Sequence, residues 1–345
     1  MAIPIQNLYY MLCYAWHILD EEEFTDLNAI PGAESSLSLL IYLLQKQNHH
    51  LIKKGIAQNY VRETQVVNGI KGKLEINLSF QGNLLKQGKA VCSFETTSTD
   101  ILLNQVIKAT LLRLLALTEI TPEWKSLIHY QIKAFPEVKV VAVKSTDFDQ
   151  AKQIKAINPY YKPVLAICEL IWSNLLPEAE DGKFYFRSFL EDERQMGHLF
   201  EAFVRNFYRQ EQKQYEVKAE RIKWILDTSD ETALEYLPLM VTDISLLSSK
   251  RNIIIDTKFY RAALLKRYEK QKLISAHLYQ LFAYLKNRNS KYKDQLTEGM
   301  LLYPVVQQEI DLTYHMQGHQ LSIKTINLAQ PWPHIKQDLL AIIRA

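Results

Sequence analysis

The chain has 345 residues, and its 48% hydrophobic residues are enough to fill two ordinary cores. Its formal net charge is only +3, which excludes a uniformly basic nucleic-acid-binding protein and limits any nucleic-acid surface to part of the chain. It contains no apolar run of about 18 residues, and its first residues lack the charged segment and cleavage site of a signal peptide. We therefore expect a cytoplasmic protein that does not span a membrane.

The residues present also exclude several kinds of site. Cys13, Cys92 and Cys168 are widely spaced, which indicates neither a disulfide framework nor a zinc site. The nine histidines have no metal-ligand spacing. A GxxxxGK[ST] phosphate-binding loop is absent throughout, so this polypeptide is not expected to bind GTP by itself.

The first part of the chain predicts a domain that mixes helices and strands. Residues 5–19 and 35–51 indicate buried helices, because apolar residues cover most of their circumference. Residues 100–117 predict another helix, whereas residues 121–160 have a mixed, irregular composition. We expect an N-terminal α+β domain over residues 1–160.

A hairpin with a basic tip is predicted within this domain. Residues 59–78 have a β pattern, and Asn68-Gly69 between apolar stretches is a strong signal for a hairpin turn. The glycines there are explained by a turn that needs positive φ. The alternative is a projecting hairpin that docks on a partner protein. The contact residues would then be Gly69, Lys71, Gly72 and Lys73.

The second part predicts an α/β domain over residues 161–345. Its expected elements, in chain order, are helices at 163–176 and 194–209, a strand at 215–226, a hairpin at 239–260, a long helix at 266–285, strands near 299–305 and within 308–328, and a closing helix at 332–343.

The hairpin at residues 239–260 carries the residues with the clearest chemistry. Both of its strands are rich in apolar and β-branched residues, and a polar interruption between them predicts the turn. A turn centred between residues 249 and 250 places Asp243 directly opposite Asp256. Because side chains alternate along a strand, Lys258 shares the face of Asp256.

Two opposed acids on a largely buried strand need a counter-charge. Like charges directly opposite each other are unfavourable, and buried carboxylates are tolerated when they are paired or metal-bound. A Mg²⁺ ion held by Asp243, Asp256 and the carbonyl of Thr257 would resolve the conflict. Lys258 beside it could orient or help deprotonate an attacking water. The alternative for Asp256 and Lys258 is a surface salt bridge, which is common for Asp-x-Lys on a strand.

The chain around this hairpin is strongly basic. Phosphodiester cleavage needs such surroundings, because cations hold the nucleic-acid backbone while acids hold the metal. Over residues 250–272 only Asp256 and Glu269 are acidic. The basic residues there are Lys250, Arg251, Lys258, Arg261, Lys266, Arg267, Lys270 and Lys272.

The arrangement of Asp243, Asp256 and Lys258 resembles the Asp, Asp-x-Lys core of the PD-(D/E)xK nuclease superfamily. The whole chain resembles McrC, the nuclease subunit of the McrBC modification-dependent restriction system. The resemblance runs in order from near residue 3 to near residue 340. Its motifs are IPIQNLYYMLCYAW, NGIKGKLEINLSF, TDILLNQVIKATL, TDISLL, IIIDTKFY, LYQLFAYL, LLYP and INLAQPWPHIKQDLL.

The resemblance implies a restriction-endonuclease-like α/β fold for residues 161–345 and metal-dependent hydrolysis of double-stranded DNA. It also points to two residues outside the hairpin. Glu201, on the helix before the core sheet, would reach the metal or a water, and Gln280, on the helix after the Asp-x-Lys strand, would face the scissile phosphate. A solvent-facing Glu201 and a buried or capping Gln280 remain alternatives.

The resemblance further implies a partner, McrB, a hexameric AAA+ GTPase ring that binds the GTP and reads modified cytosine. The N-terminal domain would enter the pore of this ring and stimulate hydrolysis. One rival function is a non-catalytic adaptor that activates the ring, against which Asp243, Asp256 and Lys258 in one register argue. Another is a nuclease acting alone on structured or damaged DNA, against which the full-length resemblance argues.

Overall fold

The computed structural model describes residues 3–18, 35–154, 158–177, 184–226, 235–260, 264–267, 270–289, 297–305 and 308–344. The contacts divide the chain into two compact units. We call Leu40–Arg187 the helical unit, and Met1–Leu39 together with Ser188–Ala345 the sheet unit. Within the described ranges, none of the helices combines the length and hydrophobicity that a membrane span requires.

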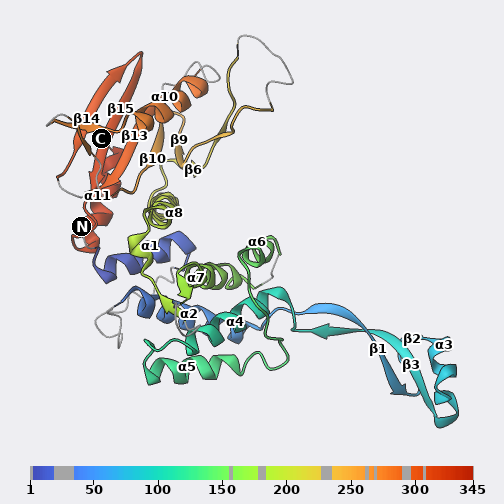
Figure 1. The fold of residues 1–345 in the computed structure, drawn as a ribbon. Helices are drawn as coiled ribbons and strands as arrows, with labels where there is room; N and C mark the ends of the chain where they lie inside the picture. Colours follow the sequence, from blue (N-terminus) through green and yellow to red (C-terminus); the bar gives the residue numbers. More distant parts are fainter. Residues whose placement is uncertain are drawn as a thin grey trace. The chain divides into compact units, whose positions relative to one another are not determined.

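The sheet unit is built on a mixed six-stranded sheet with the order β14-β15-β13-β10-β9-β6 (Figure 1). The three middle strands β15, β13 and β10 are parallel, and the flanking strands run antiparallel to their neighbours. Buried parallel strands read as continuous apolar runs, as Ile253 to Ile255 do in β10. The strands are β6 (Glu216–Lys218), β9 (Ile244–Leu247), β10 (Asn252–Thr257), β13 (Thr297–Pro304), β14 (Asp311–Met316) and β15 (His319–Ile326).

Helix α10 (Ser275–Asn289) covers one face of this sheet. Leu281 and Leu285 on the helix are fully buried against strand residues of the same core. Gly299 on β13 permits the close approach, because a Cβ there would lie 2.8 Å from Leu285 Cδ1 and 3.0 Å from Leu281 Cδ2. The predicted helix at 266–285 is therefore wrong in its first part. The short strands β11 (Leu264–Arg267) and β12 (Lys270–Leu273) precede α10 as a separate ladder.

The second face of the sheet is also covered by helices. Helix α8 (Glu193–Glu211) contacts β10, and α11 (Trp332–Arg344) contacts β15. Because α10 occupies the first face, we place α8 and α11 on the second, where Ile253 and Ile255 are buried. The predicted strand at 215–226 is two short strands instead, β6 in this sheet and β7 (Arg221–Ile222), which pairs with β8 (Met240–Val241).

Helix α1 (Ile5–Trp16) belongs to the sheet unit although it begins the chain. Its Tyr14 ring packs against Phe203 of α8 and Trp332 of α11, and Asn206 Nδ2 of α8 donates to the Tyr14 carbonyl at 3.1 Å. Asn7 Nδ2 donates to the carbonyls of Leu328 and Gln330, both at 2.8 Å. The opening and closing motifs of the sequence thus meet in this unit.

The units differ from the predicted division between residues 160 and 161. The cause is tertiary packing at both ends of the first segment. Helix α1 packs on α8 in the sheet unit, whereas α7 (Tyr161–Ser173) packs on α4 (Leu102–Leu115) in the helical unit. Contacts between residues far apart in the sequence therefore determine the two units, and a single boundary along the chain cannot describe them.

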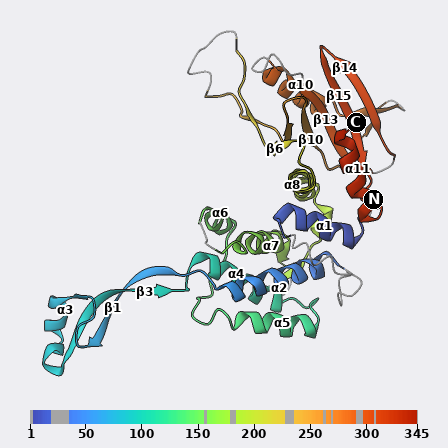
Figure 2. The ribbon, with the colours of Figure 1, turned by 180° about the vertical axis from the view of Figure 1, so that it is seen from behind.

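The helical unit is organised around α4. Val106, Ile107 and Leu111 on this helix are fully buried, as its apolar periodicity predicts. Around it lie α2 (Ser36–Lys54), α5 (Pro122–Ile132), α6 (Ser145–Gln153) and α7, with a small ladder of β4 (Leu175–Pro177) and β5 (Phe184–Phe186) (Figure 2). Residues 121–160 thus contain two helices where an irregular segment was expected.

A long antiparallel ribbon extends from the helices of this unit and carries residues 69–88 at its tip; we call residues 59–98 the arm (Figures 1 and 2). Strand β1 (Asn59–Asn68) pairs antiparallel with β3 (Lys89–Ser98) over its whole length. The predicted hairpin turn at Asn68-Gly69 is therefore wrong. The segment after β1 forms the two-residue strand β2 (Lys73–Leu74), helix α3 (Ile76–Gln81) and the 3₁₀ helix η2 (Leu84–Gln87). Strand β3, the partner of β1, follows these elements in the chain.

Gly69 and Gly72, which follow β1, are required for different structural reasons. Gly69 has φ of +80° and open space around it, which indicates a purely conformational requirement. Gly72 has φ of +72°, and a Cβ there would lie 2.6 Å from the Ser93 carbonyl oxygen. Gly72 therefore lets β2 approach β3, while Lys71 Nζ lies 4.0 Å from the centre of the Phe94 ring.

The base of the arm is held by a buried polar group on α4. Asn104 Nδ2 donates to the carbonyls of Ala57, just before β1, and Thr99, just after β3, at 2.9 and 2.7 Å. The Tyr161 hydroxyl donates to Asn104 Oδ1 and accepts from the Ala57 N–H. One side chain therefore binds both strands where they leave the helices, and the motif residue Asn104 has an internal role.

We expect Tyr161→Phe to lower the free energy of unfolding by about 1–2 kcal/mol, because it leaves two buried polar partners unsatisfied. Tyr160→Phe is the matched control, since Tyr160 stacks on His50 through its ring, and it should change stability by less than about 0.5 kcal/mol. Urea unfolding of both variants measures the difference. Equal effects of the two substitutions would contradict this role of the Tyr161 hydroxyl.

Candidate active site

The hairpin register predicted from the turn is confirmed. Asn252 pairs with Leu247 and Ile255 with Ile244, so the next step along the ladder would pair Asp256 with Asp243. Asp243 lies one residue before β9 begins, so it is not itself paired in the β9–β10 ladder. It remains at the carboxyl end of β10, the edge where ligands bind in open sheets with parallel strands.

Asp243 is bound to the neighbouring strand through its side chain. Its Oδ2 accepts a hydrogen bond from the Thr257 N–H at 2.8 Å and another from Thr257 Oγ1 at 3.0 Å. Both hydrogen bonds from the described residues end on the same oxygen, so Oδ1 remains available to a ligand. The two bonds replace the ladder pairing that ends at Ile255.

Asp256 is fully buried on the face of the sheet that α10 covers. Among the described residues, neither of its oxygens accepts a hydrogen bond of good geometry, and its close charged neighbour is Lys258, with Nζ 2.9 Å from Oδ2. Burial, and then the charge of Asp243, raise the pKa of Asp256 to about 7, although Lys258 opposes the shift. A buried carboxylate without hydrogen-bond donors is costly unless a cation joins it.

Lys258 connects this carboxylate to α10. Its Nζ donates to Gln280 Oε1 at 3.0 Å, and Gln280 Nε2 donates to the Tyr284 hydroxyl at 2.8 Å. Burial alone would lower the pKa of Lys258, but the charges of Asp256 and Asp243 raise it above its usual value. The lysine is therefore a cation at neutral pH, with its ammonium group directed by Gln280.

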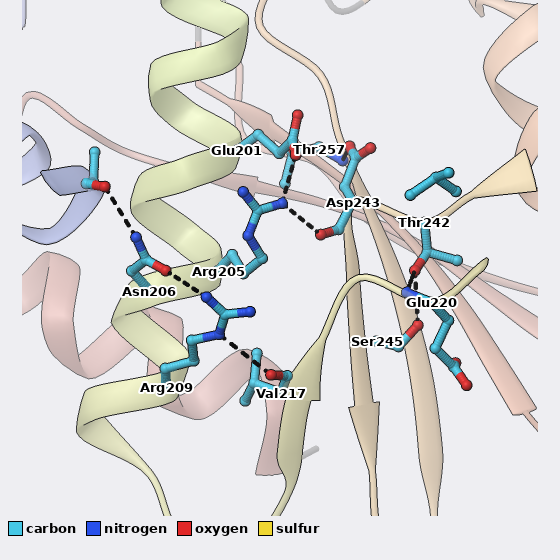
Figure 3. A network of polar contacts seen from close by, with 12 residues as sticks. Glu201, Arg205, Asn206, Arg209, Val217, Glu220, Thr242, Asp243, Ser245 and Thr257 are labelled. Carbon is cyan, nitrogen blue, oxygen red and sulfur yellow. Dashed lines mark hydrogen bonds and ion pairs between the residues drawn. The ribbon is translucent and has the colours of Figure 1, made fainter. Parts of the chain in front are cut away.

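Glu201 reaches the same region from α8 (Figure 3). Its Oε1 accepts a hydrogen bond from Arg205 Nη1 at 2.6 Å, and the same nitrogen donates to the Asp243 carbonyl oxygen at 3.1 Å. Burial and the nearby charge of Asp243 raise the pKa of Glu201, and Arg205 opposes this. Glu201 is therefore a half-buried member of the acidic cluster.

The structure brings together the six candidate residues of the C-terminal part in the sheet unit: Glu201, Asp243, Asp256, Thr257, Lys258 and Gln280. The candidate contact residues Gly69, Lys71, Gly72 and Lys73 lie in the arm, in the helical unit. Sequence reasoning missed Arg205 as a member of the site. Its spacing of four residues from Glu201 on an amphipathic helix is the signal that predicts contact between them.

The basic flank of the hairpin is described only in part. Lys250 is exposed, and Arg251 donates to both oxygens of Glu298, at 2.7 and 2.6 Å. Arg251 therefore stabilises the fold. The side chains of the remaining basic residues, apart from Lys258, lie outside the described residues: Arg261, Lys266, Arg267, Lys270 and Lys272.

The donor set suits a metal that keeps water ligands. In the described ranges, no three His, Cys, Asp or Glu side chains lie close enough to hold a metal ion by themselves. Two acids, Asp243 and Asp256, face the same strand end, and of the two buried Asp256 oxygens Oδ2 has Lys258 Nζ at 2.9 Å. Mg²⁺ is commonly bound by one or two carboxylates, with water and substrate phosphate completing six ligands. The residues present fit such an ion.

Comparison with known proteins decides the family. The family model of the McrBC 5-methylcytosine restriction system component matches residues 5–304. The chain belongs to this family. It is 32% identical over 341 residues to the type IV methyl-directed restriction enzyme EcoKMcrBC of Escherichia coli (strain K12), covering 99% of this chain and 97% of that relative. The McrBC resemblance predicted from the sequence motifs is thereby confirmed.

A solved structure supports the fold. It is a refined half-complex from a tetradecameric assembly of Thermococcus gammatolerans McrB AAA+ hexamers with bound McrC. The similarity has a TM-score of 0.56 at 14% sequence identity, and covers 98% of this chain and 76% of that chain. The chain thus shares its mixed α/β architecture with this solved structure.

The raised pKa of Asp256 predicts a pH-dependent stability in the metal-free protein. The folded chain binds the Asp256 proton up to about pH 7, whereas the unfolded chain releases it near its ordinary value. Stability from this group is therefore present at acid pH and lost as pH rises towards 7 and above. In EDTA, the stability of Asp256→Asn relative to wild type should rise by at least about 1 kcal/mol between pH 5 and pH 8.

Urea unfolding at the two pH values measures this change. Asp311→Asn is the control, because the side chain of Asp311 is 71% exposed, at the edge of the same sheet. It should follow the pH dependence of wild type. Parallel curves for wild type and Asp256→Asn would show that Asp256 is ionised at both pH values.

Proposed function

We propose that the chain is the endonuclease subunit of a modification-dependent restriction complex, with a PD-(D/E)xK nuclease fold in the sheet unit. Its reaction would be Mg²⁺-dependent hydrolysis of phosphodiester bonds in double-stranded DNA that carries modified cytosine. The observation that supports this best is the fully buried Asp256 carboxylate, which lies beside Asp243 and has Lys258 Nζ 2.9 Å from one of its oxygens.

The residues have distinct roles in this proposal. Asp243, Asp256 and the carbonyl of Thr257 would hold Mg²⁺, which when bound supplies positive charge at the phosphate and favours ionisation of a water. Thr257 keeps the Asp243 carboxylate at the strand end through two hydrogen bonds. The other Asp243 oxygen would then be the one that binds Mg²⁺.

Lys258 would act as a cation and not as a free base. Its raised pKa keeps the ammonium group protonated, so it can orient the attacking water and offset the negative charge that develops on the phosphoryl oxygens. Gln280 holds the ammonium by accepting a hydrogen bond from it, and is itself fixed by the hydrogen bond it donates to Tyr284. Glu201 adds a further carboxylate, which can accept a proton from a water bound in the cluster.

The helical unit would contact the partner ring. The solved relative holds McrC bound to McrB AAA+ hexamers, and we propose that this chain likewise binds an McrB-like GTPase hexamer that carries the GTP. The arm with Gly69, Lys71, Gly72 and Lys73 would stimulate GTP hydrolysis. We place the complex in the cytoplasm, with which three buried cysteines that form no disulfide agree.

Asp256→Asn tests the nuclease proposal. With the partner ring, GTP and Mg²⁺, wild type should cut methylated plasmid DNA, and the variant should lose at least about 100-fold in cleavage rate, because one metal carboxylate is gone. GTP hydrolysis followed in the same tubes should remain stimulated. The exposed control Asp311→Asn should cut like wild type. If wild type stimulates the GTPase and never cuts, the chain is a non-catalytic adaptor with a nuclease-like fold.

The arm is tested by reversing its charge. Lys71→Glu combined with Lys73→Glu should lower stimulated GTP hydrolysis several-fold at a fixed ring concentration, since a basic contact surface becomes acidic. The control is Lys125→Glu on α5 combined with Lys133→Glu directly after it, an equal change of charge in the same unit. Stimulation that is unchanged in the arm variant would exclude these lysines from the contact.

A further inference from the structure

Asp243 is held in place by contacts outside the sheet ladder. It begins the approach to β9, and Thr242 before it is fixed by two hydrogen bonds with Glu220, at 3.0 Å for Thr242 N–H and 2.9 Å for Glu220 N–H. Ser245 Oγ lies 2.9 Å from Thr242 Oγ1 (Figure 3). These contacts fix the sheet side of Asp243 and leave its carbonyl oxygen directed towards α8.

Arg205 binds that carbonyl from α8. A single nitrogen, Nη1, donates at 3.1 Å to the Asp243 carbonyl oxygen and at 2.6 Å to Glu201 Oε1. The arginine side chain is 22% exposed and that of Glu201 29%. Solvent therefore weakens this ion pair less than it weakens a fully exposed pair. The two acids come from sequence positions far apart, and Arg205 joins them through one atom.

The acids would otherwise repel each other. Glu201 faces the charges of Asp243 and Asp256 from the sheet, and Arg205 and His198 from its own helix. A cation fixed between Glu201 and the Asp243 backbone offsets this repulsion before any metal binds. Arginine suits this place because it stays charged and its planar group can bind two acceptors at fixed angles.

We infer that Arg205 is a positioning residue of the nuclease site, which fixes Glu201 and Asp243 relative to each other so that the acidic cluster is formed before it binds a divalent cation. This inference rests on the proposed function. Arg205 does not touch the reacting atoms, and it acts through the two acids. Residues that orient metal ligands from outside the ligand set commonly contribute about 10- to 100-fold to metal affinity or activity. We expect a contribution of about tenfold from Arg205.

The helix offers a matched control one turn further on. Arg209 also donates to a backbone carbonyl, that of Val217 at 3.3 Å, and to Asn206 Oδ1 at 3.1 Å. Figure 3 shows that these contacts point away from Asp243. Replacing Arg209 therefore removes an equivalent arginine from the same helix without touching the acidic cluster.

The test compares wild type, Arg205→Met, Arg205→Lys and Arg209→Met as full-length chains. Mn²⁺ binding, followed by electron paramagnetic resonance, gives a readout that needs no catalysis. Arg205→Met should weaken Mn²⁺ binding about tenfold, Arg205→Lys should recover part of it through its charge, and Arg209→Met should stay within about twofold of wild type.

Cleavage of methylated plasmid with the partner ring gives the second readout. Arg205→Met should raise the half-saturating Mg²⁺ concentration about tenfold and lower the maximal rate less, while stimulated GTP hydrolysis remains that of wild type. A purely structural role would affect both arginine variants alike and would not separate the Mg²⁺ requirement from the maximal rate.

The outcomes are distinguishable. If wild type cuts and Arg205→Met binds Mn²⁺ and cuts equally well, Arg205 has no positioning role, and the nuclease proposal stands. If Arg205→Met and Arg209→Met lose Mn²⁺ affinity equally, with lower thermal midpoints, the inference is likewise overturned. If wild type neither binds Mn²⁺ nor cuts, the proposed function fails and the inference fails with it.

Discussion

The sheet unit depends on the buried carboxylate of Asp256. This residue lies near the carboxyl end of β10, directly after three buried isoleucines, where an ionised group is normally excluded. Lys258 is its close counter-charge, at 2.9 Å, and cannot satisfy both oxygens. The surrounding contacts concentrate charge at one strand end instead of dispersing it, which is a cost to stability that functional sites commonly bear.

The architecture explains how this charge is assembled. Parallel strands β10 and β13 end at the same edge, and the connections to their helices leave α8 and α10 on either side of it. Gln280 approaches from α10 and Glu201 from α8, so the acids and the lysine are reached from both layers. Gly299 contributes indirectly, because it brings α10 close enough for Gln280 to meet Lys258.

Much of the site was predictable from the sequence because its information is local. Alternation along β10 and the position of the turn determine that Asp243, Asp256 and Lys258 meet, and both are read from one short segment. The resemblance pointed to Glu201 and Gln280 as site residues, and the structure shows their partners, Arg205 and Lys258. Arg205 was missed because a surface ion pair and a site arginine have the same spacing on a helix.

The errors in the fold have a common cause in contacts between distant residues. Asn68-Gly69 has the local chemistry of a hairpin turn, yet β1 gains a ten-residue ladder by pairing with β3. A turn signal does not report that alternative partner. The grouping of α1 with the last helix likewise depends on Tyr14 meeting Trp332, which no local pattern can show.

The order of the chain also has a consequence for biosynthesis. Helix α1 leaves the ribosome before α11 but must wait for it, whereas the continuous helical unit can fold before translation ends. A half-made chain would thus carry its folded arm well before it carried an assembled cluster of acids.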